Sequence, residues 1–178
     1  MKFLIASDLH GSSYYAKKIV DKMDEEGADK LIFLGDIYNH GPRNPLPKEY
    51  DPIKVSEILN AIKDKMIVVK GNCDSAVDTM ISDFDFIENV CLVVGGKTVY
   101  LTHGHVHNKD VMPKTKFDLV IYGHFHTGFI EEMNGTIIAN TGSLSLPKNN
   151  TKNSYIILDE EKLTLKDIDG TIIKSINL

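Results

Sequence analysis

The first seventy residues alternate short, largely apolar runs with stretches whose apolar positions recur at helical spacing. Residues 2–6, 31–34 and 66–69 form the apolar runs, and such runs are typical of strands buried on both faces. The intervening stretches are long enough for helical crossovers, so the pattern predicts parallel strands joined by helices.

Two amphipathic helices are predicted between these runs. In the first, positions 16, 19, 20 and 23 are apolar, Ser12 or Ser13 is the expected N-cap, and Gly27 closes the helix. The second begins at Asp51 and Pro52, with a capping carboxylate before a proline in the first turn, and positions 55, 58, 59 and 62 are apolar. A short third helix is predicted over residues 75–81.

The second half of the chain is rich in predicted strands. Turn signals at Gly95-Gly96, Asn134-Gly135 and Asp169-Gly170 separate short apolar runs, as in hairpins. The predicted strands are 90–94, 98–102, 119–122, 128–132, 136–140, 155–158, 163–168 and 172–176. Residues 106–117 are polar and remain unassigned. Together the two halves predict an α/β protein in which two sheets pack face to face with helices outside.

Composition narrows the class of protein. A chain of 178 residues fits one domain, residues 1–178, and the net charge of −5 argues against a nucleic-acid groove. Two cysteines give no disulfide framework, which favours a reducing compartment. The apolar run at residues 2–6 is too short for a signal peptide or a membrane span, so we expect a cytoplasmic protein. The strands near the C-terminus could pair between copies in a homo-oligomer.

The stretch Tyr122-Gly123-His124-Phe125-His126 directly follows one of the apolar runs. Two histidines one residue apart can converge on one point at a strand end, and imidazole suits zinc, manganese, iron or nickel. Taken alone, the pair could equally be surface histidines of a loop.

Other polar residues also follow apolar runs directly, which changes the interpretation of the two histidines. The carboxyl ends of parallel strands gather along one sheet edge, so these groups can converge. They are too many for one closed tetrahedral zinc site, and they suit two ions that share a bridging carboxylate. The set comes from five segments and comprises Asp8, His10, Asp36, Asn72, His103, His124 and His126. Alternatively, Asp8 could cap a helix and His10 could lie on the surface.

A long loop at residues 37–51 holds three of the six prolines. Structureless loops of this length in compact domains usually have a function. Arg43 and His40 are its candidates for substrate binding, with solvated loop side chains as the alternative. In the run 103–107, only His103 is assigned as a ligand. His105 could support the site or face the substrate, and His107 is expected on the surface.

Five ordered motifs resemble those of the calcineurin-like metallophosphoesterases, over residues 5 to about 145. They are Asp8-x-His10, Gly35-Asp36, Gly71-Asn72-Cys73-Asp74, His103-Gly104-His105 and Gly123-His124-x-His126. The match is closer still to the small bacterial YfcE-type phosphodiesterases. The segments that carry this closer likeness are Asn39-His40-Gly41-Pro42-Arg43-Asn44, Gly71-Asn72-Cys73-Asp74-Ser75 and Asn140-x-Gly142-Ser143.

This resemblance implies a four-layer α/β/β/α sandwich of two packed mixed sheets, and a specific ligand assignment. A first ion would be bound by Asp8, His10, Asp36 and His126. A second would be bound by Asp36, Asn72, His103 and His124, with Asp36 as the bridge. Manganese is a common choice in the family, and zinc, iron, nickel and cobalt stay open.

The resemblance also implies hydrolysis of a small phosphodiester by a hydroxide activated between two metal ions. Asp36, Asn72, Cys73 and Asp74 are the expected catalytic positions, and Asn72 is also expected to contact substrate. Many relatives carry histidine at the position of Cys73, where it is thought to protonate the leaving group. The cysteine therefore makes a phosphomonoesterase or protein phosphatase the weaker alternative. A scaffold that kept the fold without catalysis, like a retromer subunit of this fold, is disfavoured because all seven ligand positions are intact.

Overall fold

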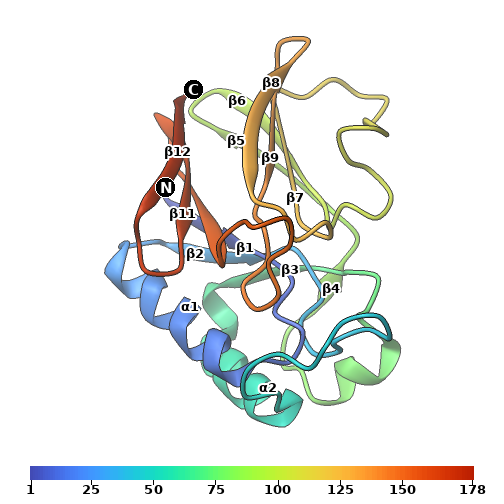
Figure 1. The fold of residues 1–178 in the computed structure, drawn as a ribbon. Helices are drawn as coiled ribbons and strands as arrows, with labels where there is room; N and C mark the ends of the chain where they lie inside the picture. Colours follow the sequence, from blue (N-terminus) through green and yellow to red (C-terminus); the bar gives the residue numbers. More distant parts are fainter.

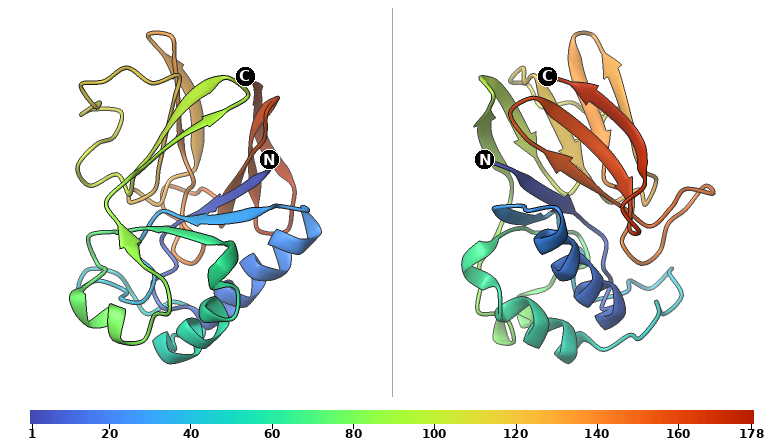
Figure 2. Two further views of the ribbon diagram at one scale, coloured as in Figure 1. Left: turned by 180° about the vertical axis from the view of Figure 1, so that it is seen from behind. Right: turned by 90° about the vertical axis from the view of Figure 1, so that its left-hand side faces the viewer.

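The computed structural model describes residues 1–178, and its first apolar runs form the centre of a seven-stranded sheet (Figure 1). Three parallel strands pair in register here: β1 (Phe3–Ala6), β2 (Lys30–Phe33) and β3 (Met66–Val69). The crossovers contain the helices α1 (Ser13–Glu25) and α2 (Pro52–Asn60). Both helices lie against the same face of the sheet (Figure 2).

The C-terminal meander completes this sheet. β10 (Ser154–Leu158) pairs antiparallel with β1, and β11 (Lys162–Asp167) and β12 (Ile172–Asn177) follow as hairpin neighbours. The short strand β4 (Phe86–Ile87) pairs with β3 at the opposite edge. The resulting order is β12-β11-β10-β1-β2-β3-β4.

The second sheet contains five strands in the order β5-β6-β7-β9-β8. β7 pairs in parallel with β6 and β9, whereas the β5–β6 and β8–β9 pairs are antiparallel hairpins. The strands are β5 (Val90–Val94), β6 (Lys97–Leu101), β7 (Leu119–Tyr122), β8 (Phe129–Met133) and β9 (Thr136–Asn140).

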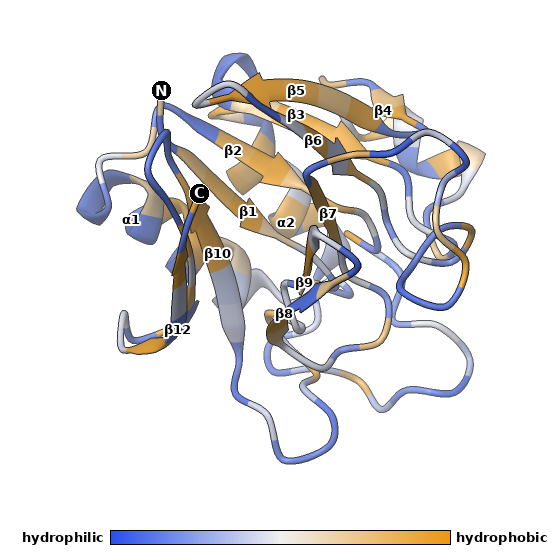
Figure 3. Cartoon of the chain, turned by 90° about the horizontal axis from the view of Figure 1, so that it is seen from above, coloured by the Kyte–Doolittle hydropathy of each residue, from blue (hydrophilic) through white to orange (hydrophobic).

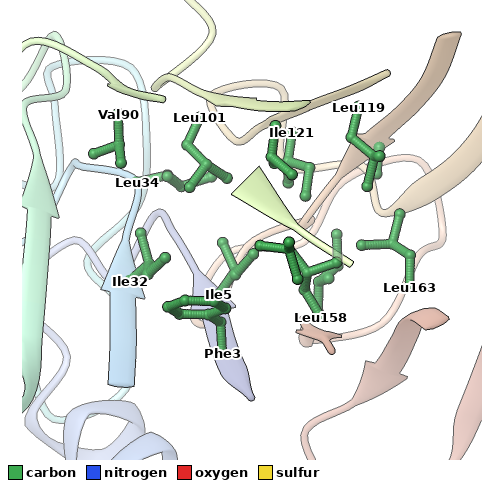
Figure 4. Packing of buried hydrophobic residues seen from close by; sticks show 14 of the residues in the cluster. Phe3, Ile5, Ile32, Leu34, Val90, Leu101, Leu119, Ile121, Leu158 and Leu163 are labelled. Carbon is green, nitrogen blue, oxygen red and sulfur yellow. The ribbon is translucent and has the colours of Figure 1, made fainter. Parts of the chain in front are cut away.

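Alternating side chains of the central strands explain why these runs are apolar throughout. Phe3 and Ile5 point into the core between the sheets, while Leu4 and Ala6 pack under the helices. Figure 3 shows the hydrophobic strands surrounded by largely polar loops. In Figure 4, Leu101 of the second sheet faces Ile5 and its neighbours of the first.

The capping predictions for both helices are confirmed. The side chain of Ser12 accepts a hydrogen bond from the backbone N–H of Tyr15, and Asp51 accepts one from Lys54. These caps satisfy N–H groups that have no partner within the helix. The structure contains no helix with the length and apolar character needed to cross a bilayer.

The predicted α/β class and the two packed mixed sheets are confirmed, but three local predictions differ. The sequence predicts a short helix over residues 75–81, and the structure has a 3-10 helix there, η2 (Ala76–Met80), rather than an α-helix. Val77 and Met80 are 61% and 81% exposed, so the segment has no buried apolar face that would extend it into an α-helix. The strand β4 and a 3-10 turn, η1 (Lys63–Lys65), lie where the sequence pattern predicted nothing.

The outer face of the second sheet lacks the helical layer that the resemblance implied. The connection from residue 102 to residue 118 covers it without forming a helix. Met112 and Phe117 from this connection pack on Tyr100 and Tyr122, and these contacts take the place of a helix's apolar face. Figure 1 shows this connection looping beside β6 and β7.

Candidate metal centre

The carboxyl ends of β1, β2 and β7 carry residues in an unusual backbone conformation. Left-handed φ angles are uncommon for residues other than glycine, because they cost conformational energy. They persist only where the surrounding structure enforces them, and such places are often functional sites. Five of the seven predicted ligands adopt them: Asp8 (55°), His10 (51°), Asp36 (57°), His124 (66°) and His126 (59°). Tight turns after each strand therefore direct these side chains back across the sheet edge.

One group of donors gathers at the ends of β1 and β7. His10 Nε2 lies 3.1 Å from His126 Nε2, and Asp8 Oδ1 lies 3.3 Å from His126 Nε2. The Nδ1 atom of His10 contacts the carbonyl of Asn39 at 2.7 Å, and that of His126 contacts Leu146 at 2.7 Å. A carbonyl only accepts, so each Nδ1 donates, and each neutral ring turns a lone pair at Nε2 toward the other.

A second group of donors gathers around His103. Its Nδ1 donates to the carbonyl of Leu34 at 2.6 Å, which again leaves Nε2 as the free atom of the neutral ring. His103 Nε2 lies 3.0 Å from Asn72 Oδ1 and 3.3 Å from His124 Nδ1. His103 is fully buried, whereas Asn72 is exposed and His124 is half-buried, so this group opens toward solvent.

Asp36 lies between the two groups. Its Oδ1 is 3.5 Å from His103 Nε2, and its Oδ2 is 3.8 Å from His10 Nε2. Oδ1 also accepts the backbone N–H of Cys73 at 2.8 Å. One carboxylate thus offers one oxygen to each group, which is the arrangement predicted for a bridging ligand.

The donor set fits divalent cations. Asp8 Oδ1 is fully buried and has no hydrogen-bond partner, and such an orphaned carboxylate oxygen is costly without a cation. Opposed imidazole lone pairs have the same need. Carboxylate, imidazole and amide donors together suit borderline divalent metals. The structure therefore brings all seven predicted ligands together, and metal binding by them stays a prediction.

The ionisation of the histidines also reflects a site built for positive charge. Burial lowers the pKa of His103, but the hydrogen bond that its protonated ring donates to Asp36 and the charges of Asp8 and Asp36 outweigh it and raise this pKa to about 9. Burial and then the charge on His103 lower the pKa of His124 to about 4. A proton on His103 can thus take the place of a cation.

Two glycines allow the strand ends to approach this closely. A Cβ at Gly71 would collide with the Asp36 carboxylate, and a Cβ at Gly123 would collide with the side chains of Ser7 and Asp8. The Gly-Asn and Gly-His pairs in the motifs therefore have a steric reason.

Asp74, predicted as catalytic, holds the backbone of the site. Its Oδ2 accepts the N–H groups of Asp36 at 2.8 Å and Gly71 at 2.7 Å, and its Oδ1 accepts that of Ile37 at 2.8 Å. Burial raises the pKa of Asp74 to about 6, against the opposing effect of these N–H donors. The carboxylate ties the end of β2 to the end of β3 and so acts as a positioning residue.

A supporting segment at residues 140–143 was not assigned a role from the sequence. Asn140 donates to the carbonyl of Gly123 at 2.6 Å, and Ser143 donates to that of Asp8 at 2.7 Å. Ser7 bridges the Asp8 carboxylate and Thr141. The Asn-x-Gly-Ser likeness was a signal for this segment, but only the packed sheets bring it beneath the ligands.

A cleft of about 600 Å³ opens over the two donor groups. Asp36, Asn72, Cys73, His124 and His126 line it, together with Arg43 from the predicted functional loop. Phe125 and Lys148 also line the cleft, and sequence reasoning missed both. Lys148 had no signal in the sequence, because it lies outside every motif.

His40 is not part of this cleft lining. Its ring packs edge-on against Tyr50, with ring centroids 5.3 Å apart. His105 lies near the second donor group, 5.4 Å from the ring of His103, and burial lowers its pKa. His107 faces the hydroxyl of Tyr100 at 3.0 Å, outside the site.

Comparison with known families agrees with this geometry. The family model described as the calcineurin-like phosphoesterase superfamily domain matches residues 1–163. The chain belongs to this superfamily. Phosphodiesterase YfcE of Escherichia coli K12 is 40% identical over 167 residues, which cover 93% of this chain and 91% of that protein. The probable metallophosphoesterase YsnB of Bacillus subtilis is 30% identical over 90% of this chain and 85% of its own length.

Two solved structures share the fold. The structure of YfcE, a phosphoesterase from E. coli, superposes with a TM-score of 0.94 at 37% identity, covering 99% of this chain and 98% of that one. Vps29 of Entamoeba histolytica, solved in complex with zinc, gives a TM-score of 0.62 at 19% identity over 100% and 98% of the chains. At that identity the likeness shows the fold alone. The predicted calcineurin-like and YfcE-type resemblance is confirmed.

Proposed function

We propose that the protein is a metal-dependent phosphodiesterase with a dinuclear centre that prefers manganese. The observation that carries this proposal is the position of Asp36, which offers one oxygen to each of two groups of metal-type donors. The name of the E. coli relative, a phosphodiesterase that is 40% identical, supports the choice of reaction.

The ligand assignment of this proposal follows the two donor groups. Asp8, His10 and His126 would hold one ion, Asn72, His103 and His124 would hold the other, and Asp36 would contact both. When bound, the metal ions supply positive charge that activates water and stabilises the developing charge on phosphoryl oxygens.

The cleft residues of this chain then have distinct tasks. Arg43 is exposed at the cleft wall, and its guanidinium can bind a phosphate oxygen pair in a bidentate manner. Asn72 would orient substrate as well as bind metal. Burial and the charge of Asp36 raise the pKa of Cys73 to about 12, so a thiolate nucleophile is scarce near neutral pH. Water is therefore the better nucleophile.

The proposal includes the context of the enzyme. We propose one functional domain over residues 1–178 and a small phosphodiester as substrate. The cleft of about 600 Å³ has a size suited to such a substrate. Both cysteines, Cys73 and Cys91, are free, which is consistent with the proposed cytoplasmic location. The edge strand β12, with Ile172 and Ile173 exposed, is our candidate surface for pairing in a homo-oligomer, and light scattering tests it.

The activity test uses one leaving group in two esters. Metal-stripped protein is supplied separately with Mn²⁺, Zn²⁺, Fe²⁺, Ni²⁺ and Co²⁺ and assayed with bis(p-nitrophenyl) phosphate and p-nitrophenyl phosphate. We expect hydrolysis that depends on metal, is fastest with Mn²⁺ and favours the diester. Faster hydrolysis of the monoester would instead indicate a phosphomonoesterase, and inactivity with every ion would indicate a scaffold.

A further inference from the structure

A second hollow adjoins the metal cleft. It has a volume of about 260 Å³ and shares one residue with the cleft, Phe125, which therefore forms the wall between them. Its walls are aromatic, because Tyr122 and Phe129 line it together with Phe125. We call this hollow the aromatic pocket. A group bound there would be next to a phosphate in the cleft.

Phe125 is a large aromatic side chain that is exposed beside the proposed metal centre. It lies between two proposed metal ligands, yet its side chain is 44% exposed. Its ring meets His124 and Tyr122 edge-on, with centroid distances of 5.0 and 6.0 Å. No ring of this chain stacks on its face, and burying that face against a ligand would be favourable.

The rim of the aromatic pocket is polar. Thr127, Asn149, Asp110 and Lys109 line it, and they offer both hydrogen-bond donors and acceptors. Asn149 donates to the Thr127 hydroxyl at 3.0 Å, which positions the amide at the rim. The ring of Tyr122 lies nearly perpendicular to those of Phe125 and Phe129, at 75° and 77°, so the pocket has aromatic walls rather than a flat floor. An exposed Phe125 face with donors and acceptors near it suits a planar ring whose edge is polar.

We propose that the aromatic pocket binds the base of a nucleoside ester, so that the substrates are phosphodiesters of nucleotides. This inference rests on the proposed phosphodiesterase function, because the phosphate of the same substrate would occupy the cleft. The reaction adds water across the phosphorus–oxygen bond to the leaving alcohol, releasing that alcohol and a nucleoside monophosphate. The base stays in the aromatic pocket until that product dissociates.

The test compares two product-like inhibitors that differ only in the base. Thymidine 5′-phosphate and 2-deoxyribose 5-phosphate are titrated against hydrolysis of methyl p-nitrophenyl phosphate by the manganese-loaded protein. We expect the nucleotide to inhibit at a concentration about tenfold lower, because base–aromatic stacking has about that effect on binding. Phe125→Ala should remove the difference and leave the metal content unchanged.

Two further variants guard this test. Asn149→Ala, at the rim and outside the ligand set, should reduce the nucleotide's advantage without changing the sugar phosphate's inhibition. Met80 is an exposed residue of η2, and Met80→Ala should leave the inhibition by both phosphates unchanged. Equal inhibition by both phosphates in the wild-type protein would overturn the inference while the hydrolysis itself still supports the proposed function. Phenyl phosphate inhibiting as well as the nucleotide would also overturn it, because the polar rim would then contribute nothing.

Discussion

Replacing Asp74 tests whether this carboxylate positions the metal centre or takes part in chemistry. It is buried, and its two oxygens accept three backbone N–H groups, from Asp36, Ile37 and Gly71. Asp74→Ala leaves all three donors without a partner, and each unsatisfied buried group costs about 1–3 kcal/mol. We therefore expect the free energy of unfolding to fall by at least about 3 kcal/mol, which for a chain of this size lowers Tm by about 6–12 °C.

Asp74→Asn is the milder change. The amide oxygen can keep the two N–H groups that Oδ2 accepts, while its NH₂ group would face the N–H of Ile37. One lost acceptor costs about 1–3 kcal/mol. A positioning role predicts weakened manganese affinity in both variants, with kcat of Asp74→Asn recovering to within about tenfold of wild type at saturating metal.

The assay is chemical denaturation with and without Mn²⁺, followed by kcat measured across a manganese titration. Asp78→Asn is the matched control, since Asp78 is also buried but accepts only the backbone N–H of Ser75 and contacts no proposed ligand. The reasoning is refuted if Asp74→Asn is as stable as wild type and binds manganese equally well. If the kcat of Asp74→Asn stays about a thousandfold below that of the wild type at saturating metal, Asp74 takes part in the chemistry.

Three other substitutions test separate parts of the structure. Arg43→Ala should raise KM for several diesters with metal content unchanged, and a wild-type KM would mean that this arginine is merely solvated. Cys73→His should accelerate alkyl esters more than nitrophenyl esters, because a positioned general acid contributes about 10²–10⁴-fold and poor leaving groups need it most. A uniform loss on both esters, compared by kcat/KM, would reject that role. Glu26 accepts from Lys166 at 2.7 Å and from Tyr155 at 2.7 Å, and these partners outweigh burial and lower its pKa. Its contribution to stability is fully present above the unfolded pKa of about 4.3 and is lost progressively as pH falls from there through the lowered pKa of the folded state. Glu26→Gln should therefore lower the free energy of unfolding by about 1–2 kcal/mol at pH 7 and by less near pH 3. Urea titrations at the two pH values measure this, and an equal loss at both would contradict the reasoning.

The parts of the fold that the sequence predicts are those with a strong local pattern. The apolar run at 2–6 and the cap at Ser12 dictate their own structure, because burial and capping act within a few residues. By contrast, η2 has a capping box between Ser75 and Asp78 but no apolar face, so the local pattern predicts a short helix without showing that it is a 3-10 helix. The two-residue strand β4 depends on its pairing with β3, which no local pattern reveals.

The candidate site divides in the same way. Asp36 and the other six candidate ligands could be predicted because each follows an apolar run, and the strand ends of a parallel sheet share an edge. The positioning role of Asp74 could not be read from its motif, because its partners include the end of another strand. The place of Lys148 in the cleft wall and the aromatic pocket behind Phe125 could not be predicted, because both form only when distant segments pack together.

The most direct test of the dinuclear centre is the stoichiometry of manganese binding to Asp36→Asn. Calorimetric titration of the metal-stripped wild-type protein should give two manganese ions per chain. Because the proposed bridge contacts both donor groups, the variant should bind both ions more weakly and lose about a thousandfold or more in kcat, since metal-derived charge stabilisation contributes several kcal/mol. Its circular dichroism should match wild type, because Asp36 lies at a strand end outside the hydrophobic core. Two ions bound with wild-type affinity by Asp36→Asn would contradict the bridging role on which the proposal depends.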